Sequence, residues 1–256
     1  MSVSARPMQR IRLMRALMRW LLLLLLAGVG LQVFFVLRIA AMNWLTPEST
    51  SFQRSQAWRI VLRDGQLPWR QASVDMGALA KPLQRAVIAS EDANFTQHRG
   101  VWWQSIESAW QKNAKAIAQA EKRAQRQPEK PVAVKIVGGS TITQQLAKNL
   151  FLSGERTLLR KGQEVVLAVA LETFLSKRRI LEIYLNNVEW GEGVFGAEAA
   201  AQHYFRKSAA RLSSWESARL AVMLPRPRHY EKQAQSVFLT RRAETIVARM
   251  NGVELP

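Results

Sequence analysis

Residues 158–175 decide the fold, and they read LLRKGQEVVLAVALETFL. When this segment is drawn as a helix, apolar side chains fall on nearly every side of it. A helix that is apolar nearly all round is typical of the buried centre of a domain. We therefore expect a central buried helix here, with further helices packed around it.

The sequence before this segment predicts two more helices. From Gly77 onward, Leu79, Leu83, Ala86 and Val87 follow the spacing i, i+4, i+7, i+8, which places side chains on one buried helix face. Residues 113–135 are rich in Ala, Lys, Gln and Arg, and they read as an exposed helix followed by a flexible basic loop. The basic insert around Lys122–Lys135 belongs to this stretch.

Three helices are predicted after residue 175. Ser176 is placed to cap a helix over Lys177–Asn186. The sequence Ser-Ser-Trp-Glu at 213–216 is a capping box in front of Ala218–Leu224. Residues 237–250 read as a last amphipathic helix.

Residues 41–76 are poorly periodic, and tryptophan, glycine and proline are scattered through them. We interpret them as a stalk and irregular lead-in, with a short strand at Trp58–Arg63. No alternating run of strand length stands out in the region that follows. The sequence therefore predicts one mainly α domain over residues 77–256.

The amino-terminal residues predict a membrane anchor over positions 20–40. Trp20–Leu37 is apolar apart from Gln32 and two glycines, which is at the short end of what spans a bilayer as a helix. Five arginines lie in the basic tail 1–19, so the positive-inside rule places that tail in the cytoplasm and the bulk of the chain outside. A cleaved signal peptide is the alternative, but its apolar core would be ~7–15 residues long, and Ile39-Ala40-Ala41 is a poor cleavage site.

Composition narrows the kind of partner. The chain has no cysteine, which excludes disulfides, thiolate zinc sites and cysteine nucleophiles. Its net charge is +18, which implies an anionic partner: nucleic acid, anionic lipid or a phosphorylated substrate. The predicted topology speaks against nucleic acid, because it places the basic domain outside the cytoplasm.

A first candidate site lies where the helix that follows Gly77 ends. Residues 91–100 read EDANFTQHRG after an apolar stretch. A carboxylate at the end of a buried helix is partly desolvated, which raises its pKa and suits it to general acid or base catalysis. Glu91 is therefore a candidate catalytic residue, and an ordinary helix end with solvated acids is the alternative.

A second candidate site combines glycines, residues with hydroxyl side chains, and cationic residues in neighbouring sequence segments. Residues 138–149 read GGSTITQQLAKN, which predicts a helix start that binds an anion or, alternatively, a simple polar turn with a cap. The cations that follow are Lys148, Arg156, Arg160 and Lys161, with Glu164 one helical turn on. Cations in a fixed arrangement suit a diphosphate, because arginine binds two oxygens at once, whereas a solvated basic face is the alternative.

Taken in order, these blocks resemble glycosyltransferase family 51, and in particular the monofunctional biosynthetic peptidoglycan transglycosylases. The resemblance covers about residues 78–224. It rests on the blocks 91–100, 139–149 and 160–164 and on residues 180–186, which read ILEIYLN. It implies a lysozyme-like, largely helical domain whose hydrophobic jaw dips into the membrane, on the periplasmic face of the bacterial inner membrane.

The resemblance also implies a reaction and a set of site residues. The family joins a growing, lipid-diphosphate-linked glycan to the 4-hydroxyl of an incoming lipid II, with inversion to a β-1,4 linkage and release of undecaprenyl diphosphate. Glu91 matches the family's essential glutamate, the general base, and Glu164 matches the glutamate that assists at the donor side. The positions expected to bind substrate are Asp92, Phe95, His98, Ser140, Thr141, Gln144, Gln145, Lys148, Asn149, Arg156, Arg160 and Lys161.

Cofactors and partners follow from the same resemblance. Some members of the family use a divalent cation, Mg²⁺ or Mn²⁺, at the diphosphate, but the sequence shows no dedicated ligand cluster. The implied partners are lipid II, the growing glycan, membrane lipids, and cell-wall synthesis or division proteins. The sequence contains no Ser-x-x-Lys motif, which predicts that there is no transpeptidase activity.

Three other functions fit parts of the pattern. A lytic transglycosylase or muramidase works with a single catalytic glutamate on a similar fold, but it has no need of cations gathered for a diphosphate. A membrane-tethered basic protein would bind nucleic acid or anionic lipid with strong salt dependence and without any need of Glu91. An inactive scaffold in a cell-wall complex is the third.

Overall fold

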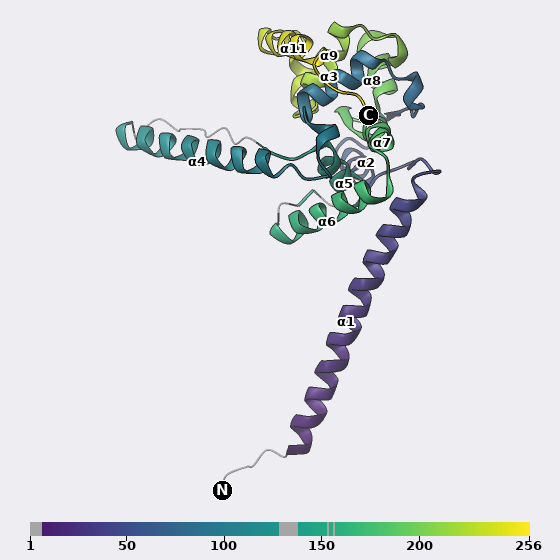
Figure 1. The fold of residues 1–256 in the computed structure, drawn as a ribbon, viewed down its shortest axis with the longest axis vertical. Helices are drawn as coiled ribbons and strands as arrows, with labels where there is room; N and C mark the ends of the chain where they lie inside the picture. The colour runs from purple at the N-terminus through teal and green to yellow at the C-terminus, as the bar shows by residue number, and fades with distance from the viewer. Residues whose placement is uncertain (1–6, 128–137, 153, 156) are drawn as a thin grey trace. The chain divides into compact units, whose positions relative to one another are not determined.

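The computed structural model describes residues 7–127, 138–152, 154–155 and 157–256. The chain divides into two units, Met1–Leu45 and Thr46–Pro256. The described part of the first unit is dominated by one helix, α1 (Pro7–Ala41), shown in purple in Figure 1. Within it, Ile11–Ala41 is long and apolar enough to cross a membrane.

The helix α1 begins before the predicted anchor at residues 20–40. Pro7 stands at its start, where proline is well tolerated because the first N–H groups of a helix have no partner within it. Arg12, Arg15 and Arg19, which the sequence assigned to a cytoplasmic tail, therefore lie on the same continuous helix as the apolar span. Single-pass anchoring remains consistent with this helix.

The second unit is mainly α, as the sequence predicts. Its longer helices are α2 (Ser51–Asp64), α3 (Lys81–Glu91), α4 (Trp103–Arg126), α5 (Ile142–Phe151), α6 (Leu158–Phe174), α7 (Lys177–Asn187), α8 (Ala197–Phe205), α9 (Ser214–Met223) and α11 (Val237–Met250). The short helical turns are η1 (Met76–Ala78), η2 (Phe95–Gln97), η3 (Ala209–Arg211), α10 (Pro227–Tyr230) and η4 (Glu231–Gln233).

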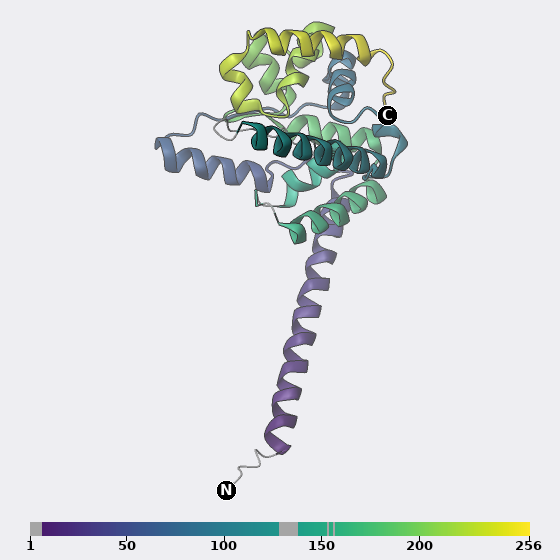
Figure 2. The same cartoon turned by 90° about the vertical axis from the view of Figure 1, so that its left-hand side faces the viewer.

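The helices of this unit form two groups. In the first, α3 packs against α9 and α11, and in the second, α5 packs against α2, α6 and α7. The first group lies above the second in Figures 1 and 2. The buried face predicted after Gly77 is confirmed, because Leu79, Leu83, Ala86 and Val87 are all buried. The caps at Ser176 and Ser213 and the helix over 237–250 are confirmed as well.

A small sheet joins segments that are far apart in sequence. Strand β3 (Val194–Phe195) pairs in parallel with β1 (Arg70–Gln71) and antiparallel with β2 (Glu189–Gly191). Strands of two or three residues carry no alternating pattern, so the sequence analysis missed them. Gly193 makes the turn before β3 with a φ of +72°, and a Cβ there would lie 2.1 Å from a backbone oxygen of Pro68.

The short strand predicted at Trp58–Arg63 is wrong, because these residues lie within α2. Thr50 and Gln53 form a capping box at the start of α2, and Gly65 ends the helix in the left-handed conformation. Much of the predicted stalk at 41–76 thus belongs to the second unit, which begins at Thr46.

The helix at 158–175 is not the buried centre that its composition predicts. In α6 the buried residues are Glu164, Leu167, Ala168 and Leu171, all on the side that packs against α5 and α7. Leu158 is 92% exposed on the outer side. An all-round apolar pattern does not distinguish a helix covered on every side from one whose second apolar face is left uncovered.

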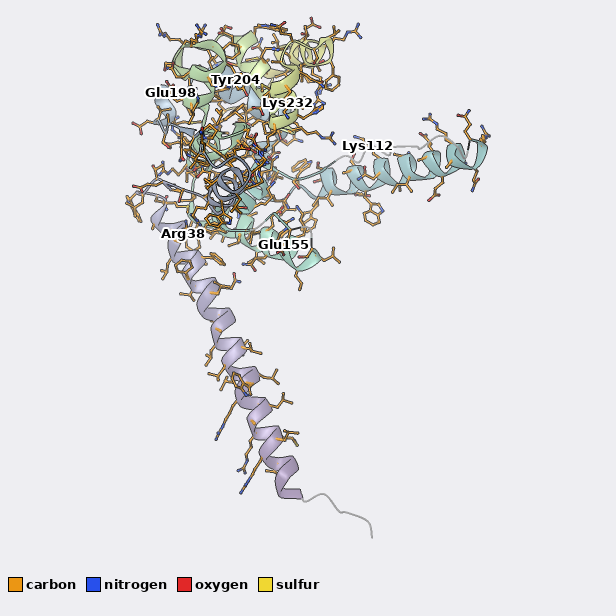
Figure 3. All side chains as sticks on the ribbon, turned by 180° about the vertical axis from the view of Figure 1, so that it is seen from behind. Arg38, Lys112, Glu155, Glu198, Tyr204 and Lys232 are labelled. Carbon is orange, nitrogen blue, oxygen red and sulfur yellow. The ribbon has the colours of Figure 1, made fainter. Side chains whose placement is uncertain are left out.

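The helix α4 extends away from the rest of the second unit (Figure 1). Ala109 is its one buried residue, while Trp103, Trp110 and Ile117 are exposed. Basic side chains such as Lys112 are exposed along it too (Figure 3). The prediction of an exposed helix from residue 113 is confirmed up to Arg126, and the loop predicted up to Lys135 lies mostly outside the described residues.

Candidate active site

Glu91 is the last residue of α3, and the packing of α3 against α9 and α11 fixes where that last turn lies. The carboxylate of Glu91 accepts a hydrogen bond from Nε2 of Gln145 at 3.0 Å and one from the Ser90 hydroxyl at 3.3 Å. Burial raises the pKa of Glu91, because a desolvated carboxyl group resists ionisation. The two hydrogen bonds lower this pKa but do not cancel the effect of burial.

Asp92 holds two segments of the site together. One of its carboxylate oxygens accepts from the backbone N–H of Ile142 at 3.0 Å, and it lies 2.9 Å from Nε2 of His98. The side chains of Asp92 and His98 are nearly fully buried, with 6% and 2% exposed. Asp92 therefore fixes the start of α5 relative to the end of α3.

The start of α5 uses its backbone donors internally. Thr141 and Gln144 form a capping box, in which each side chain accepts from the other's backbone N–H, and Asp92 takes the N–H of Ile142. The Thr141 hydroxyl donates to the backbone oxygen of Gly100 at 2.6 Å. These three N–H groups are thus satisfied within the protein, as expected for a capped polar turn.

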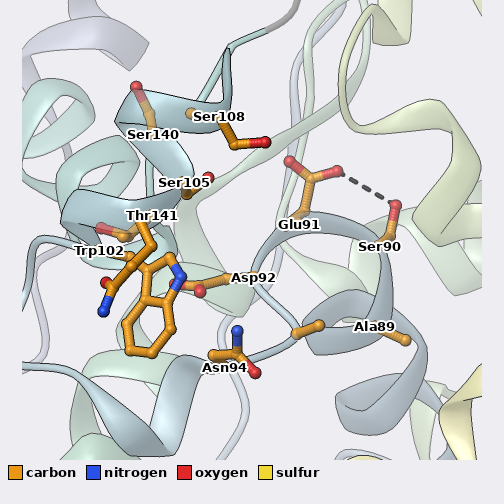
Figure 4. A pocket seen from close by; sticks show the side chains of 13 residues that line it. Ala89, Ser90, Glu91, Asp92, Asn94, Trp102, Ser105, Ser108, Ser140 and Thr141 are labelled. Carbon is orange, nitrogen blue, oxygen red and sulfur yellow. Dashed lines mark hydrogen bonds between the residues drawn. The ribbon is translucent and has the colours of Figure 1, made fainter. Parts of the chain in front are cut away.

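The first pocket is a cavity of about 350 Å³ beside Glu91. Figure 4 shows Glu91 and Ser90 on one side of it, with Ser105, Ser108 and Ser140 across from them. The further lining residues are Ala89, Asp92, Ala93, Asn94, Trp102, Gln104, Gly139 and Thr141. The lining thus combines one carboxylate of raised pKa with hydroxyl, amide and indole groups, which are the groups that bind a sugar.

A second pocket, of about 300 Å³, has a cationic lining. Lys148, Arg160 and Lys161 line it, together with the carboxylates of Glu155 and Glu164. Glu164 is 3% exposed, and it accepts from Nη1 of Arg160 at 2.9 Å and forms an ion pair with Lys161. A buried carboxylate with two cationic partners holds those cations in place without neutralising the whole pocket.

The two pockets meet at Ser140, which lines both. The Lys161 ammonium group of the second pocket donates to the Ser140 hydroxyl at 3.1 Å. Gln145 lines the second pocket and donates to Glu91 of the first. A ligand that extends past Ser140 would therefore meet Glu91 at one end and the cations at the other.

Some predicted substrate-binding residues lie outside both pockets. Phe95 is fully buried under the ammonium group of Lys177, 4.4 Å from its ring centre. His98, Gln144 and Asn149 are buried as well and line neither pocket. Arg156 lies outside the described residues. Of these residues, His98 contacts Asp92 and Gln144 caps α5 with Thr141, so both lie beside residues that line the first pocket.

The sequence analysis missed several residues of the site. Ser105 and Ser108 line the first pocket from α4, where an exposed helix gives no sign of a binding face. Tyr184 belongs to a predicted helix and to the segment 180–186 of the family resemblance but was assigned no role, and its hydroxyl donates to Oε1 of Gln145 at 3.0 Å. A tyrosine among the apolar residues of a buried helix face is a signal that would have identified it.

The described residues contain no group of three or more His, Asp or Glu side chains that would hold a metal ion. In the second pocket, Lys and Arg surround Glu164. Cations of this kind do not suit the oxygen-rich shell that Mg²⁺ or Mn²⁺ requires.

Comparison with known proteins gives consistent matches over most of the chain. A sequence model of the family described as Transglycosylase matches residues 64–251. The biosynthetic peptidoglycan transglycosylase of Burkholderia thailandensis is 47% identical over 230 residues, which are 90% of this chain and 84% of the relative. That of Herminiimonas arsenicoxydans is 46% identical over 96% of this chain and 100% of its own length. That of Bordetella pertussis is 50% identical over 82% of each chain.

Proposed function

Since the chain belongs to the transglycosylase family, we propose that it polymerises lipid II into β-1,4-linked glycan strands with release of undecaprenyl diphosphate. Membership confirms the resemblance in the sequence, and the protein is a peptidoglycan glycosyltransferase with a lysozyme-like helical domain. The observation that carries the detailed proposal is the pair of pockets that meet at Ser140.

In this proposal the first pocket binds the incoming lipid II, and Glu91 is the general base. Its carboxylate takes the proton of the 4-hydroxyl as that oxygen attacks C1 of the donor sugar. The new O4–C1 bond forms while the bond from C1 to the diphosphate oxygen breaks, so an α-linked donor gives a β-linked product. The raised pKa of Glu91 suits this role, because it brings the base nearer to the pH at which the enzyme works.

The second pocket then binds the diphosphate of the growing glycan. Lys148, Arg160 and Lys161 line it, and fixed cations stabilise the negative charge that develops on a leaving diphosphate. Glu164 assists at this donor side by holding Arg160 and Lys161 in place through its two ion pairs. Arg156, assigned to the diphosphate by family resemblance, keeps that role as a prediction.

A divalent cation at the diphosphate would take most of its ligands from the substrate. The second pocket offers two carboxylates, Glu155 and Glu164, beside its three cations, which are too few oxygen ligands to complete the shell of such an ion by themselves. Phosphate oxygens and water are the ligands that Mg²⁺ ordinarily combines with one or two carboxylates.

The membrane supplies the substrate in this proposal. Leu158 and Leu159 at the start of α6, and Trp103 and Trp110 on α4, are large apolar side chains exposed to solvent. Exposed apolar residues gathered on helices that carry Lys and Arg favour contact with a lipid surface. We assign these two faces to the membrane-dipping jaw, with α1 as the single-pass anchor and its amino terminus in the cytoplasm.

A lytic enzyme that cuts finished glycan is the principal alternative activity. The described cations of the second pocket favour synthesis, because cleavage of a glycan releases no diphosphate. Lipid II polymerisation by the detergent-purified full chain tests the choice, with intact sacculi offered in parallel. We expect long glycan from lipid II that lysozyme digests, and no release of fragments from sacculi. The opposite pattern would replace the proposal with the lytic function.

A further inference from the structure

The hydroxyl of Tyr184 is a polar atom in an apolar setting. Tyr184 is fully buried in α7 beside Ile180 and Leu181, which are also fully buried. A phenylalanine would fill nearly the same volume, and a buried hydroxyl costs free energy unless it is hydrogen-bonded. Among the described residues, the one hydrogen bond of this hydroxyl goes to Oε1 of Gln145 at 3.0 Å. Packing alone therefore does not explain the tyrosine.

The same Gln145 amide reaches Glu91 at its other end. Its Nε2 donates to Oε2 of Glu91 at 3.0 Å, so one line of hydrogen bonds joins α7, α5 and α3. Only one orientation of the amide satisfies both bonds. If the amide turned by 180°, its oxygen would face the carboxylate, two acceptors would meet, and the phenolic hydrogen would lose its buried acceptor.

We propose that Tyr184 is a positioning residue for the general base: its hydroxyl fixes the Gln145 amide so that the amide nitrogen points at Glu91. The proposal rests on the proposed role of Glu91 as that base. Tyr184 acts through Gln145 and does not touch Glu91 by hydrogen bond. Its contribution is to keep a donor aimed at the carboxylate, which favours the ionised form and holds its orientation.

The charged groups around Glu91 agree with this arrangement. Arg242 of α11 lowers the pKa of Glu91, and the neighbouring Asp92 raises it. Burial, together with Glu91 and Asp92, raises the pKa of Tyr184 well above its usual value. Tyr184 therefore keeps its proton over the whole working range of the enzyme and remains a donor to Gln145.

The first test replaces Tyr184 by phenylalanine and follows kcat/KM for lipid II polymerisation against pH. Without the hydroxyl, the Gln145 amide is oriented by the carboxylate of Glu91 alone. The amide is then held less firmly, so the carboxylate loses part of a charge-assisted hydrogen bond. We expect the acid limb of the profile to move roughly 0.5–1 pH unit higher. The matched control is Tyr204→Phe, which removes a tyrosine hydroxyl bonded to the backbone oxygen of Trp190 and should leave the limb in place.

The second test asks whether Tyr184 acts through Gln145. Gln145→Ala should move the acid limb of the pH profile in the same direction. Adding Tyr184→Phe to Gln145→Ala should move it no further, because the hydrogen bonds that connect Tyr184 to Glu91 are already lost. A purely structural role for Tyr184 predicts that the limb does not move in Tyr184→Phe, and an effect on Glu91 that bypasses Gln145 predicts that the two shifts add. An unmoved limb in Tyr184→Phe, or additive shifts in the double variant, would overturn the proposal.

A direct titration separates this proposal from the assigned activity. Carbon-13 NMR of the full chain labelled in the glutamate carboxyl groups follows Glu91, whose signal is identified by its loss in Glu91→Gln. We expect a higher pKa for Glu91 in Tyr184→Phe than in wild type or Tyr204→Phe. If wild type fails to polymerise lipid II, the proposed function falls, and this titration alone decides whether Tyr184 controls the carboxylate. Equal pKa values in all three proteins would refute the link.

Discussion

At the scale of single residues, the proposed catalytic role of Glu91 comes with an energetic cost. Its pKa is raised in the folded protein because burial disfavours the carboxylate more than Gln145 and Ser90 stabilise it. A base acts only in its ionised form, so activity falls as the pH drops through this pKa. We expect the acid limb of kcat/KM to lie above the pH at which an ordinary glutamate titrates, as a pH profile of lipid II polymerisation will measure.

The same raised pKa predicts an effect on stability. At a pH below the pKa that Glu91 has in the unfolded chain, its carboxyl group is protonated in both the folded and the unfolded protein. In that range it makes stability neither rise nor fall with pH. Above that value the unfolded chain ionises more readily than the folded one, so the buried carboxyl destabilises the fold. Glu91→Gln should therefore melt at a higher temperature than wild type near neutral pH, and the difference should shrink in acid. Calorimetry at two pH values checks this, and a variant that melts lower at neutral pH would contradict it.

Lys161 is the residue that tests the second pocket. It contacts Ser140, where the two pockets meet, and forms an ion pair with the buried Glu164. Lys161→Met keeps the length of the side chain but removes its charge, so we expect kcat to fall by about 10²–10³-fold, the usual effect of losing one preorganised group that stabilises developing charge. Lys232→Met, an exposed lysine between α10 and α11 (Figure 3), is the control. Equal rates in both variants would remove Lys161 from the diphosphate site.

At the scale of elements, the sequence predicted the helices better than it predicted their surroundings. The caps at Ser176 and Ser213 and the buried face of α3 are local signals, and the structure confirms them. The exposed half of α6 was not predictable, because apolar residues on both faces of a helix look alike in sequence whether protein or membrane covers them. The strands of the sheet were missed because their pairing joins residues 70–71 to 194–195.

In the candidate site too, the sequence reveals local features, whereas features that depend on packing appear only in the structure. Glu91 and the cations near Glu164 were identified because chemistry and spacing reveal them within single blocks. The alignment of Gln145 by Tyr184 depends on how α5 packs against α7, which a sequence alone does not show. Asn149 and Phe95 were assigned to substrate because they belong to the same blocks, whereas the fold buries both.

The exposed face of α6 gives a prediction about the membrane. The chain has no cysteine, so Leu158→Cys can carry a single environment-sensitive dye on the full-length protein. In lipid vesicles we expect blue-shifted emission from this dye and strong quenching by brominated lipid, because Leu158 belongs to the proposed jaw. Val237→Cys, at an exposed apolar residue at the start of α11, is the matched control and should remain in water. Two identical spectra would argue against a membrane-dipping α6.

At the scale of the whole molecule, the net charge of +18 and the anionic substrate predict sensitivity to salt. Lipid II carries a diphosphate, and salt screens the attraction between exposed charges over a Debye length of about 8–10 Å. We expect the apparent KM to rise several-fold between low and high salt in a neutral detergent, with kcat changed much less. A KM that is independent of salt would show that the exposed charges do not guide the substrate.

In the proposed mechanism, Glu91 removes the proton from the attacking hydroxyl. The most direct test measures the rate at which each purified full-length protein polymerises labelled lipid II without other enzymes. The three proteins are wild type, Glu91→Gln and the surface control Glu244→Gln. We expect Glu91→Gln to keep its fold and its binding of lipid II but to lose about 10²–10⁴-fold in rate, while Glu244→Gln matches wild type. Glycan synthesis at the wild-type rate by Glu91→Gln would show that Glu91 is not the general base.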